Sequence, residues 1–349
     1  MKTEIIKLTE KSPLSSYESA ARLILKGEVV GMPTETVYGL AGNAYDEAAV
    51  KKIFEAKGRP ADNPLIVHIT DAKDIEKYAY PNRQAYALAE KFWPGPLTMI
   101  LPKKECIPYA VSAGLDTVAI RCPSHPIARR LIDAAGVPLA APSANISGKP
   151  SATSAMHVLK DFGEHIDAII DGGFCDCGVE STVLTIASEP PILLRPGFVT
   201  PEQLREVLPD LKIADAVTKE LPKGAEALSP GMKHKHYAPK AEAFAVIGNS
   251  ENAAKYILGK IKKDKKTAVI CFDGEEAAFN GVAQVFSYGK AEDSEKQASK
   301  LFDLLRELDD DGIEEVYIRA GEAKGVGLAV YNRLIRACEF RIHDADRKD

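Results

Sequence analysis

Short apolar runs alternate with helix-like stretches over the first 205 residues of the chain. Apolar runs bounded by glycine, proline or polar residues predict buried strands at 28–32, 65–69, 97–101, 117–121, 137–141, 167–170, 181–186 and 192–194. A capping box at residues 15–18 is expected to open a helix that stops at Gly27, and Asp46 is expected to cap a helix that ends at Gly58. Two further helices are expected at 128–135 and 154–162. Because strands outnumber helices, we expect a mixed α/β sheet covered by helices rather than a simple doubly wound domain.

The regular pattern fades over residues 209–239, where prolines, glycines and charged residues dominate. A connection of this length is usually functional or disordered. Beyond it we expect strands at 243–247, 267–272, 283–286 and 315–318 and helices at 251–261, 294–308 and 328–338. That order predicts a smaller Rossmann-like α/β domain. The chain should therefore divide into a first domain at 1–205, a linker at 206–240 and a C-terminal domain at 241–349.

Three glycine- and cysteine-containing features need an interpretation of their own. Gly325-Val326-Gly327 opens the last predicted helix but lacks the G-x-G-x-x-G spacing, so close packing of a helix start explains it better than a dinucleotide. The six cysteines form no C-x-x-C pair, which favours reduced thiols in a cytoplasmic protein. Cys175-Asp176-Cys177 leaves a soft-metal site or a redox couple open, although matching ligands elsewhere are not apparent.

Charge and hydropathy narrow the class of function. The net charge of −5 argues against a broad electrostatic grip on nucleic acid, although local basic patches stay possible. The first residues lack the apolar core of a signal peptide, and no apolar run is long enough for a membrane span, so we expect neither a leader nor a membrane partner. No Walker motif, G-x-S-x-G elbow or H-E-x-x-H pair is present.

The candidate chemistry lies at the ends of predicted strands. Lys57 and Arg59 are held beside Gly58 and Pro60, just before the strand at 65–69, which suits either a solvated surface loop or a polyanion site. Other strand ends carry the polar residues Thr36, Asn63, His68, Thr117, Arg121, Ser143, Asn145, Ser181 and Arg195. Each of them also has a purely structural interpretation. His68 could be a hydrogen-bonded histidine of the core, Arg121 and Arg195 could form structural ion pairs, and Ser143 and Asn145 could form a turn. Ligands collect at strand ends in α/β layers, so together they suggest a positive pocket for a compact anion such as a nucleoside triphosphate.

A family resemblance covers nearly the whole chain. Lys57-Gly58-Arg59 with Ser143-Ala144-Asn145 resembles the K-x-R and S-x-N signature of the YrdC-like threonylcarbamoyl-AMP synthases. Residues 33–40, 180–183, 195–197, 229–232 and 236–239 match further motifs of that family, and 327–334 matches its long two-domain form. Cys175-Asp176-Cys177 departs from the family pattern.

The resemblance implies a twisted mixed sheet with a concave positive face, and an enzyme that joins L-threonine, bicarbonate and ATP into threonylcarbamoyl-AMP with release of pyrophosphate. It implies Mg2+ on the ATP phosphates, and a downstream tRNA threonylcarbamoyltransferase complex as the consumer of the product. Catalysis would rest on positioning and charge stabilisation by Lys57, Arg59, Arg121, Ser143 and Asn145.

The same resemblance assigns binding roles. Threonine would be bound by Thr36, His68, Arg121, Ser181 and the backbone near Ala141. ATP would be held by Lys57 or Arg59 with Asn63, Thr117, Ser143, Asn145, Ser151, Arg195 and Tyr237. The segment at 209–239 is expected to close over the ligands and exclude water, with Tyr237 reaching the nucleotide.

Two alternatives stay open. One is a double-stranded RNA or tRNA-binding module without catalysis, against which the acidic net charge and the lack of interleaved aromatics weigh. The other is a carbamoyl-adenylate-forming maturation factor, but such proteins carry cysteine-pair zinc fingers and further domains that are missing here.

Overall fold

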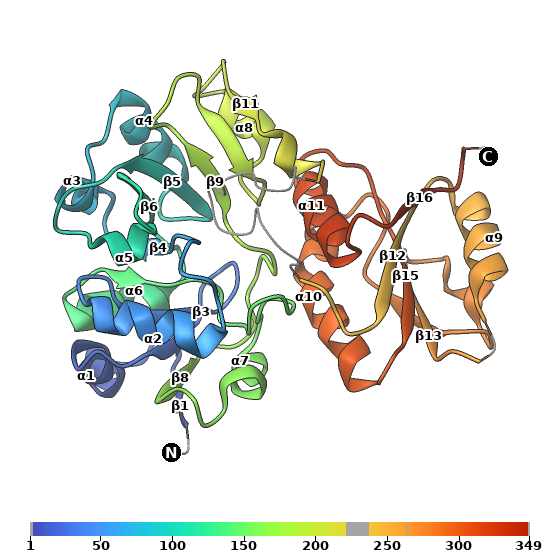
Figure 1. The fold of residues 1–349 in the computed structure, drawn as a ribbon, viewed down its shortest axis with the longest axis horizontal. Coiled ribbons are helices and arrows are strands. Elements are labelled where there is room, and N and C mark those ends of the chain that lie inside the picture. Colours follow the sequence, from blue (N-terminus) through green and yellow to red (C-terminus); the bar gives the residue numbers. More distant parts are fainter. Residues whose placement is uncertain (1–2, 221–236, 263, 348–349) are drawn as a thin grey trace. The chain divides into compact units, whose positions relative to one another are not determined.

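The computed structural model describes residues 3–220, 237–262 and 264–347, and the chain forms two compact units (Figure 1). The first comprises Met1–Ser147 and Ser151–Lys233, and the second Gly148–Pro150 and His234–Asp349. Most of the segment expected to close over the ligands, including Ser229-Pro230-Gly231-Met232 and His236, lies outside the described residues.

Within the described residues, the first unit is built on an 11-stranded sheet in the order β1-β8-β2-β3-β7-β4-β6-β5-β9-β10-β11. The strands are β1 (Glu4–Lys7), β2 (Val30–Met32), β3 (Gly39–Asn43), β4 (Ile66–His68), β5 (Leu97–Pro102), β6 (Thr117–Arg121), β7 (Leu139–Ala140), β8 (Ala168–Asp171), β9 (Thr182–Thr185), β10 (Ile192–Arg195) and β11 (Lys212–Ile213). β4 and β6 are parallel, whereas β5 and β6 are antiparallel. The predicted mixed sheet is therefore confirmed.

Helices cover this sheet and fill the connections between its strands. They are α1 (Glu18–Leu25), α2 (Glu47–Lys57), α3 (Ile75–Tyr78), α4 (Arg83–Phe92), α5 (Tyr109–Ser112), α6 (Pro126–Ala135), α7 (Ala155–Phe162) and α8 (Pro201–Arg205), with 3-10 turns at Leu14–Tyr17, Ala72–Asp74 and Asp215–Val217. Alternate residues of β8 serve different cores: Ala168 and Ile170 pack with α1 and α6, and Ile169 packs with α2 and α7. The period-2 alternation of a strand thus places helices on both faces.

Several local predictions can be scored. Asp46 caps α2 by accepting a hydrogen bond from the Ala48 amide, and Gly58 ends that helix in the left-handed region with φ of 57°. The capping box at residues 15–18 is wrong: Leu14–Tyr17 forms a 3-10 turn, and α1 begins at Glu18 without a side-chain cap. In that turn the serine hydroxyls lie inside the helical segment instead of before it.

In the first unit, the strands and helices that escaped the sequence pattern are β1, β3, β11, α3, α4, α5 and α8. The β3 sequence Gly-Leu-Ala-Gly-Asn has too few β-formers to register as a strand. Gly42 lies close to α2, since an added Cβ would lie 3.2 Å from Cδ1 of Ile53. The packing of the first unit extends beyond residue 205, since Leu208 and Leu211 pack in the main core and β11 pairs in parallel with β10.

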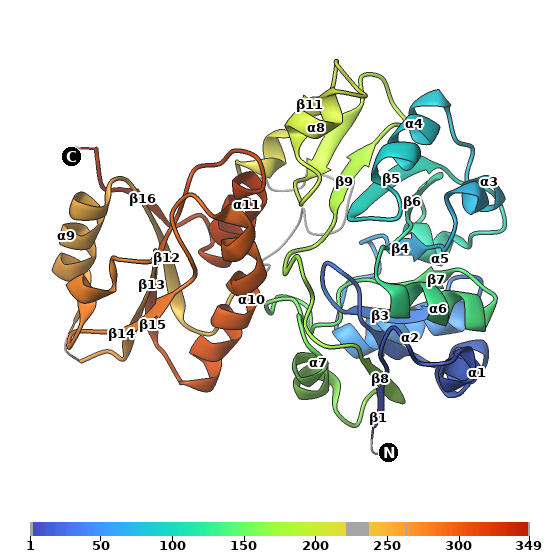
Figure 2. The same cartoon turned by 180° about the vertical axis from the view of Figure 1, so that it is seen from behind.

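The second unit holds a parallel sheet in the order β14-β13-β15-β12-β16, with all pairs parallel. Its elements are β12 (Glu242–Ile247), α9 (Ser250–Lys260), β13 (Thr267–Cys271), a 3-10 turn (Glu276–Phe279), β14 (Gln284–Ser287), α10 (Ser294–Asp310), β15 (Glu315–Arg319), α11 (Gly327–Ala337) and β16 (Ile342–Asp344). α9 lies on one face of the sheet, and α10 and α11 lie on the other (Figures 1 and 2). The expected Rossmann-like α/β layer is confirmed.

Candidate functional site

Arg121, the last residue of β6, is the centre of a buried polar cluster. Its Nη1 donates to the Thr36 hydroxyl at 2.9 Å, and its Nη2 lies 2.7 Å from Oε1 of Glu35. Apart from that ion pair, neither Nε nor Nη2 of Arg121 has a hydrogen-bond partner among the described residues. A buried guanidinium with two such donors is prepared to accept an anionic ligand.

Thr36 and Glu35 belong to a tight loop between β2 and β3. The Thr34 hydroxyl donates to the Val37 carbonyl at 2.6 Å and accepts from the Thr36 and Val37 amides at 3.2 and 3.3 Å. These local bonds fix the loop against the end of β6. Glu35 is 6% exposed, and burial alone would raise its pKa, but the Arg121 cation and neighbouring hydrogen-bond donors together lower the pKa of Glu35.

The sheet register places four polar residues in one buried row. His68 of β4 and Thr98 of β5 are the direct cross-strand partners of Arg121, so their side chains share a face. The Thr98 hydroxyl lies 2.8 Å from that of Ser181, which also accepts from Nη2 of Arg195 at 3.1 Å. The structure therefore brings three of the residues expected to bind threonine, His68, Arg121 and Ser181, into one row with Thr98.

His68 is held neutral in this row. It is 3% exposed, and its Nδ1 lies 3.2 Å from the Ile66 carbonyl, so Nδ1 carries the hydrogen. Burial and the neighbouring Arg121 cation lower the pKa of His68 to about 3. Ala141 lies close by, because its amide donates to the same Ile66 carbonyl at 2.9 Å.

Lys57 joins the two signature loops, which are far apart in sequence. Its ammonium donates to the carbonyls of Ser143 and Asn145, both at 2.5 Å, and the Ser143 hydroxyl donates to Oδ1 of Asn145 at 2.6 Å. The Ser147 amide in turn donates to the Lys57 carbonyl at 2.9 Å. Lys57 is only 2% exposed, so it acts first as a buried link that shapes the Ser143–Asn145 loop.

Other residues expected to contact ATP lie at the opposite end of β4 and β6 from Arg121. Nη2 of Arg59 donates to the carbonyls of Asn63 and Pro64 at 3.3 and 3.2 Å, and Oδ1 of Asn63 is buried without a hydrogen-bond partner among the described residues. Thr117 begins β6 and is thus about 13 Å along the strand from Arg121. A ligand that touches both ends must be extended.

Two further residues expected to contact ATP, Ser151 and Tyr237, have neighbours that differ from those of Arg59, Asn63 and Thr117. The Ser151 hydroxyl donates to Oε1 of Glu180, beside Ser181, and both side chains are buried. Tyr237 belongs to the second unit, where its ring centroid lies 5.1 Å from that of Phe302 and 5.9 Å from the Arg333 guanidinium. The role expected for Tyr237 toward the nucleotide stays a prediction.

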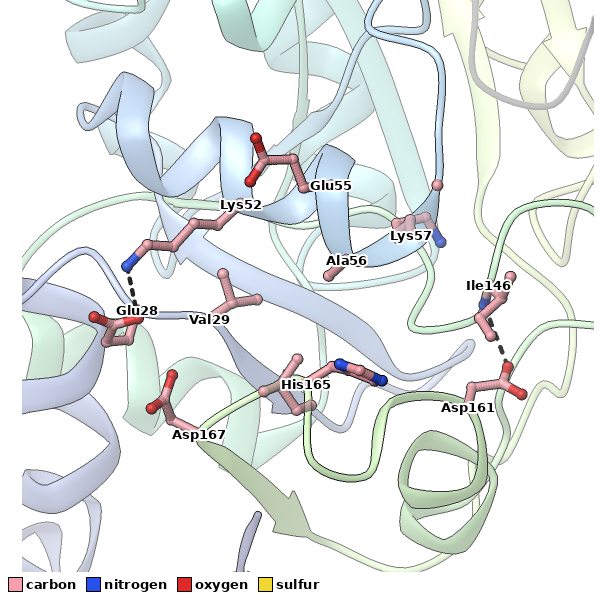
Figure 3. Close-up of a pocket in the computed structure, with 12 residues that line it drawn as sticks. Glu28, Val29, Lys52, Glu55, Ala56, Lys57, Ile146, Asp161, His165 and Asp167 are labelled. Carbon is pink, nitrogen blue, oxygen red and sulfur yellow. Dashed lines mark hydrogen bonds and ion pairs between the residues drawn. The ribbon is translucent and has the colours of Figure 1, made fainter. Parts of the chain in front are cut away.

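A separate cavity of about 610 Å³ lies beside the end of α2 (Figure 3). Asp161 lines it and accepts a hydrogen bond from the Ile146 amide at 3.3 Å, which anchors the residue after Asn145. Lys52 and Glu28 pair across another part of the cavity at 2.7 Å. Asp161, on the wall of this cavity, therefore helps to hold the segment that follows the Ser143–Asn145 loop.

The part of the chain that the structure describes gives little indication of a reactive cysteine or of a metal site. Cys175 and Cys177 are buried free thiols, and burial raises the pKa of Cys175 well above its usual value. No group of three or more metal-ligating side chains occurs among the described residues. None of the described helices is long and apolar enough to cross a membrane.

The sequence analysis did not identify three polar residues of the site around Arg121 and Ser181: Glu35, Thr98 and Glu180. Glu35 and Glu180 stand inside motifs that the sequence does mark, and an arginine at a buried strand end requires a carboxylate nearby. Thr98 gives a weaker signal, since it is one polar residue in the apolar run Leu97-Thr98-Met99. Its role depends on the strand register, which the sequence pattern does not reveal.

Comparison with known proteins assigns the chain to a family. The family described as "Telomere recombination" matches residues 22–197, and the "Threonylcarbamoyl-AMP synthase, C-terminal domain" matches residues 199–338. A Pyrococcus abyssi protein named threonylcarbamoyl-AMP synthase is 46% identical over 97% of this chain and 99% of its own, and a Bacillus subtilis protein of that name is 43% identical over 93% of each. The crystal structure of Pyrococcus abyssi Sua5 complexed with L-threonine is 45% identical, with a TM-score of 0.91 over 98% of this chain and 99% of that one. This chain belongs to the threonylcarbamoyl-AMP synthase family.

Proposed function

We propose that this chain makes threonylcarbamoyl-AMP from L-threonine, bicarbonate and ATP, releases pyrophosphate, and so supplies tRNA modification. Its full-length relatives carry that activity in their names, and a relative that is 45% identical has been crystallised with L-threonine. The observation that carries the proposal is the buried Arg121, whose Nε has no hydrogen-bond partner among the described residues and whose Nη2 contacts Glu35 in an ion pair.

Threonine fits the polar row residue by residue. The Nε and Nη2 hydrogens of Arg121 lie on one edge of the guanidinium and can donate in parallel to the two carboxylate oxygens of an amino acid. Neutral His68 can hydrogen-bond the threonine hydroxyl, which serine shares and alanine lacks. Thr36, Ser181 and the backbone at Ala141 complete the proposed threonine site.

The substrate supplies the nucleophile in this reaction. The threonine amine takes up CO2 from bicarbonate as a carbamate, and a carbamate oxygen attacks the α-phosphorus of ATP as pyrophosphate leaves. The chain therefore acts as a nucleotidyltransferase that positions two reactants and stabilises charge. We assign these roles to Lys57, Arg59, Arg121, Ser143 and Asn145.

The proposed ATP site extends from the polar row toward the other end of β4. It uses Lys57 or Arg59 together with Asn63, Thr117, Ser143, Asn145, Ser151, Arg195 and Tyr237. Each of these two cations already donates to two backbone carbonyls: Lys57 to those of Ser143 and Asn145, and Arg59 to those of Asn63 and Pro64. Mg2+ is proposed to arrive on the phosphate oxygens, which it prefers as ligands.

We place catalysis in residues 1–205, followed by a linker at 206–240 and a separate C-terminal domain at 241–349. The reactive product requires an acceptor, and we propose a tRNA threonylcarbamoyltransferase complex as that partner, with at most weak direct contact between tRNA and this chain.

A non-catalytic RNA-binding module is the competing function. Binding to an RNA backbone depends on cations that contact phosphates. The polar row around Arg121 consists instead of buried side chains that are uncharged or paired, so it gives the RNA-binding alternative no support.

A pyrophosphate-release assay tests the proposal. With ATP and Mg2+ present, release should require both threonine and bicarbonate, and serine should stimulate it much less than threonine. Mass spectrometry should identify threonylcarbamoyl-AMP as the product. Release that ignores both threonine and bicarbonate, together with tRNA binding that weakens steeply with salt, would instead establish the RNA-binding alternative.

A further inference from the structure

The second unit has a large cavity at the carboxyl ends of its parallel strands. About 940 Å³ in volume, it is lined by residues that follow β12, β13 and β15 and by the first residues of α9 and α10. This volume is within the range of small-molecule sites. The cavity lies wholly within the second unit, so it is separate from the proposed threonine site around Arg121.

The strand order explains why a crevice forms at this edge. β15 lies between β12 and β13, yet the chain leaves β12 and β13 in one direction across the sheet and leaves β15 in the other. Right-handed connections in opposite directions run over opposite faces, and α9 and α11 do lie on opposite faces (Figures 1 and 2). Such a switch in direction is where open α/β sheets bind ligands.

The floor of the cavity is rigid. Arg319, the last residue of β15, is 3% exposed and donates to the carbonyls of Val246 and Gly248 at 3.0 and 2.8 Å. Its Nε also pairs with Glu275 at 3.1 Å. Arg319 thereby ties the loop after β12 to the end of β15, and its own hydrogen-bonding groups are used in doing so.

Unused donors lie above that floor. The amides of Gly321, Glu322 and Ala323 follow one another in the loop after β15 and donate to no group among the described residues. The starts of α9 at Ser250 and of α10 at Ser294 line the same cavity, but Asn249 and Asp293 cap them, and Asp346 accepts from the Asn249 amide, so these helix starts are already supplied with acceptors.

Charge and aromatic lining narrow the ligand. The charged side chains lining the cavity are Glu292, Arg319, Glu322 and Lys324, and their formal charges cancel. Lys324 pairs with Glu322 at 3.0 Å and Arg319 with Glu275 at 3.1 Å, so the backbone amides at 321–323 set the preference for an anionic group. Phe272 and the half-buried Tyr331 add aromatic surface to the same cavity, which suits a flat apolar body beside that anion.

We propose that this crevice is a second ligand site and that it binds a mononucleotide. The phosphate accepts from the 321–323 amides, with Lys324 beside it, and the base packs against Tyr331. This site goes beyond the proposed synthase activity, because no reacting group of that activity lies in it.

Hydrogen–deuterium exchange of the full chain with AMP tests the site. At ten times its dissociation constant, AMP should slow exchange in residues 248–252 and 320–327 about tenfold. Ala323→Glu places a carboxylate among the amides and should abolish that protection, and a thermal melt checks that this variant is folded. Ala323 is exposed, as is Ala278 outside the cavity, so Ala278→Glu is the matched control and should keep the protection.

Each outcome decides the proposal. Inorganic phosphate should protect 320–324 more weakly than AMP, and adenosine should not protect this loop. Equal protection by phosphate would overturn the assignment to a nucleotide, and unchanged exchange in both segments would overturn the site itself. Threonine-dependent pyrophosphate release is measured separately, so a failure here is distinct from a failure of the proposed synthase function.

Discussion

Replacing Arg121 by lysine gives a direct measure of the threonine site. Lysine keeps a cation beside Glu35, whose side chain is 7% exposed, so the substitution avoids stranding a buried carboxylate. It removes the planar fork, and with it one of the two parallel bonds that we propose to the threonine carboxylate. A hydrogen bond to a charged group contributes about 2 kcal/mol, which corresponds to roughly 30-fold in affinity.

The assay is threonine-dependent pyrophosphate release at saturating ATP and bicarbonate. The half-saturating threonine concentration should rise by roughly 30-fold in Arg121→Lys, while the half-saturating ATP concentration should stay near that of the parent chain. Arg129→Lys is the matched control, since Nη2 of Arg129 donates to the Thr70 carbonyl at 3.2 Å and we give it no role in binding. A folded Arg121→Lys variant whose threonine response is within twofold of the control would refute the clamp.

Three further substitutions probe the surrounding cluster. Because the pKa of Glu35 is lowered in the folded chain, its ion pair should stabilise fully above the unfolded value of 4.5 and lose that effect as pH falls through the folded value. Thermal melts should therefore show a smaller acid-side loss in Glu35→Gln, and an unchanged loss would contradict the pairing. Lys57→Met leaves the Ser143 and Asn145 carbonyls without the ammonium and should lower the free energy of unfolding by about 2–4 kcal/mol in urea titrations; equal stability would show that the link is dispensable. Asn63→Ala removes a buried oxygen that has no partner among the described residues, so it should weaken ATP by about 0.5–1.5 kcal/mol with little change in melting temperature. A melting temperature that falls while the ATP response is constant would make Asn63 purely structural.

The sequence located the candidate residues better than it located their partners. Small polar and cationic residues at strand ends are visible as a pattern, and the structure does collect His68, Arg121 and Ser181 in one row. Lys57 shows the limit of that reasoning. A lysine beside Gly58 suggests an anion contact, but its ammonium is buried against two backbone carbonyls some ninety positions away. Such long-range partners depend on how the loops pack.

The sequence pattern did not reveal the strand β3 or the place of Thr98 in the polar row, for two other reasons. β3 carries few residues that favour strands, yet it pairs with β2 and β7, and α2 packs closely over Gly42. Thr98 joins the polar row only because β5 pairs with β6 in one particular register. Side-chain packing and strand pairing decide both features, and neither leaves a periodic signal in a single sequence.

The row of His68, Arg121 and Thr98 has a consequence for how the amino-acid preference of this protein can change. The three residues face one another through backbone pairing across β4, β6 and β5, so the spacing between them is set by the distance between strands. Length changes in the surrounding loops leave that spacing intact, whereas a shift of one residue in any strand would turn its member of the row to the opposite face. Within the proposed threonine site, a new preference must therefore arise by exchanging side chains at fixed positions, and this row gives a short list of such positions.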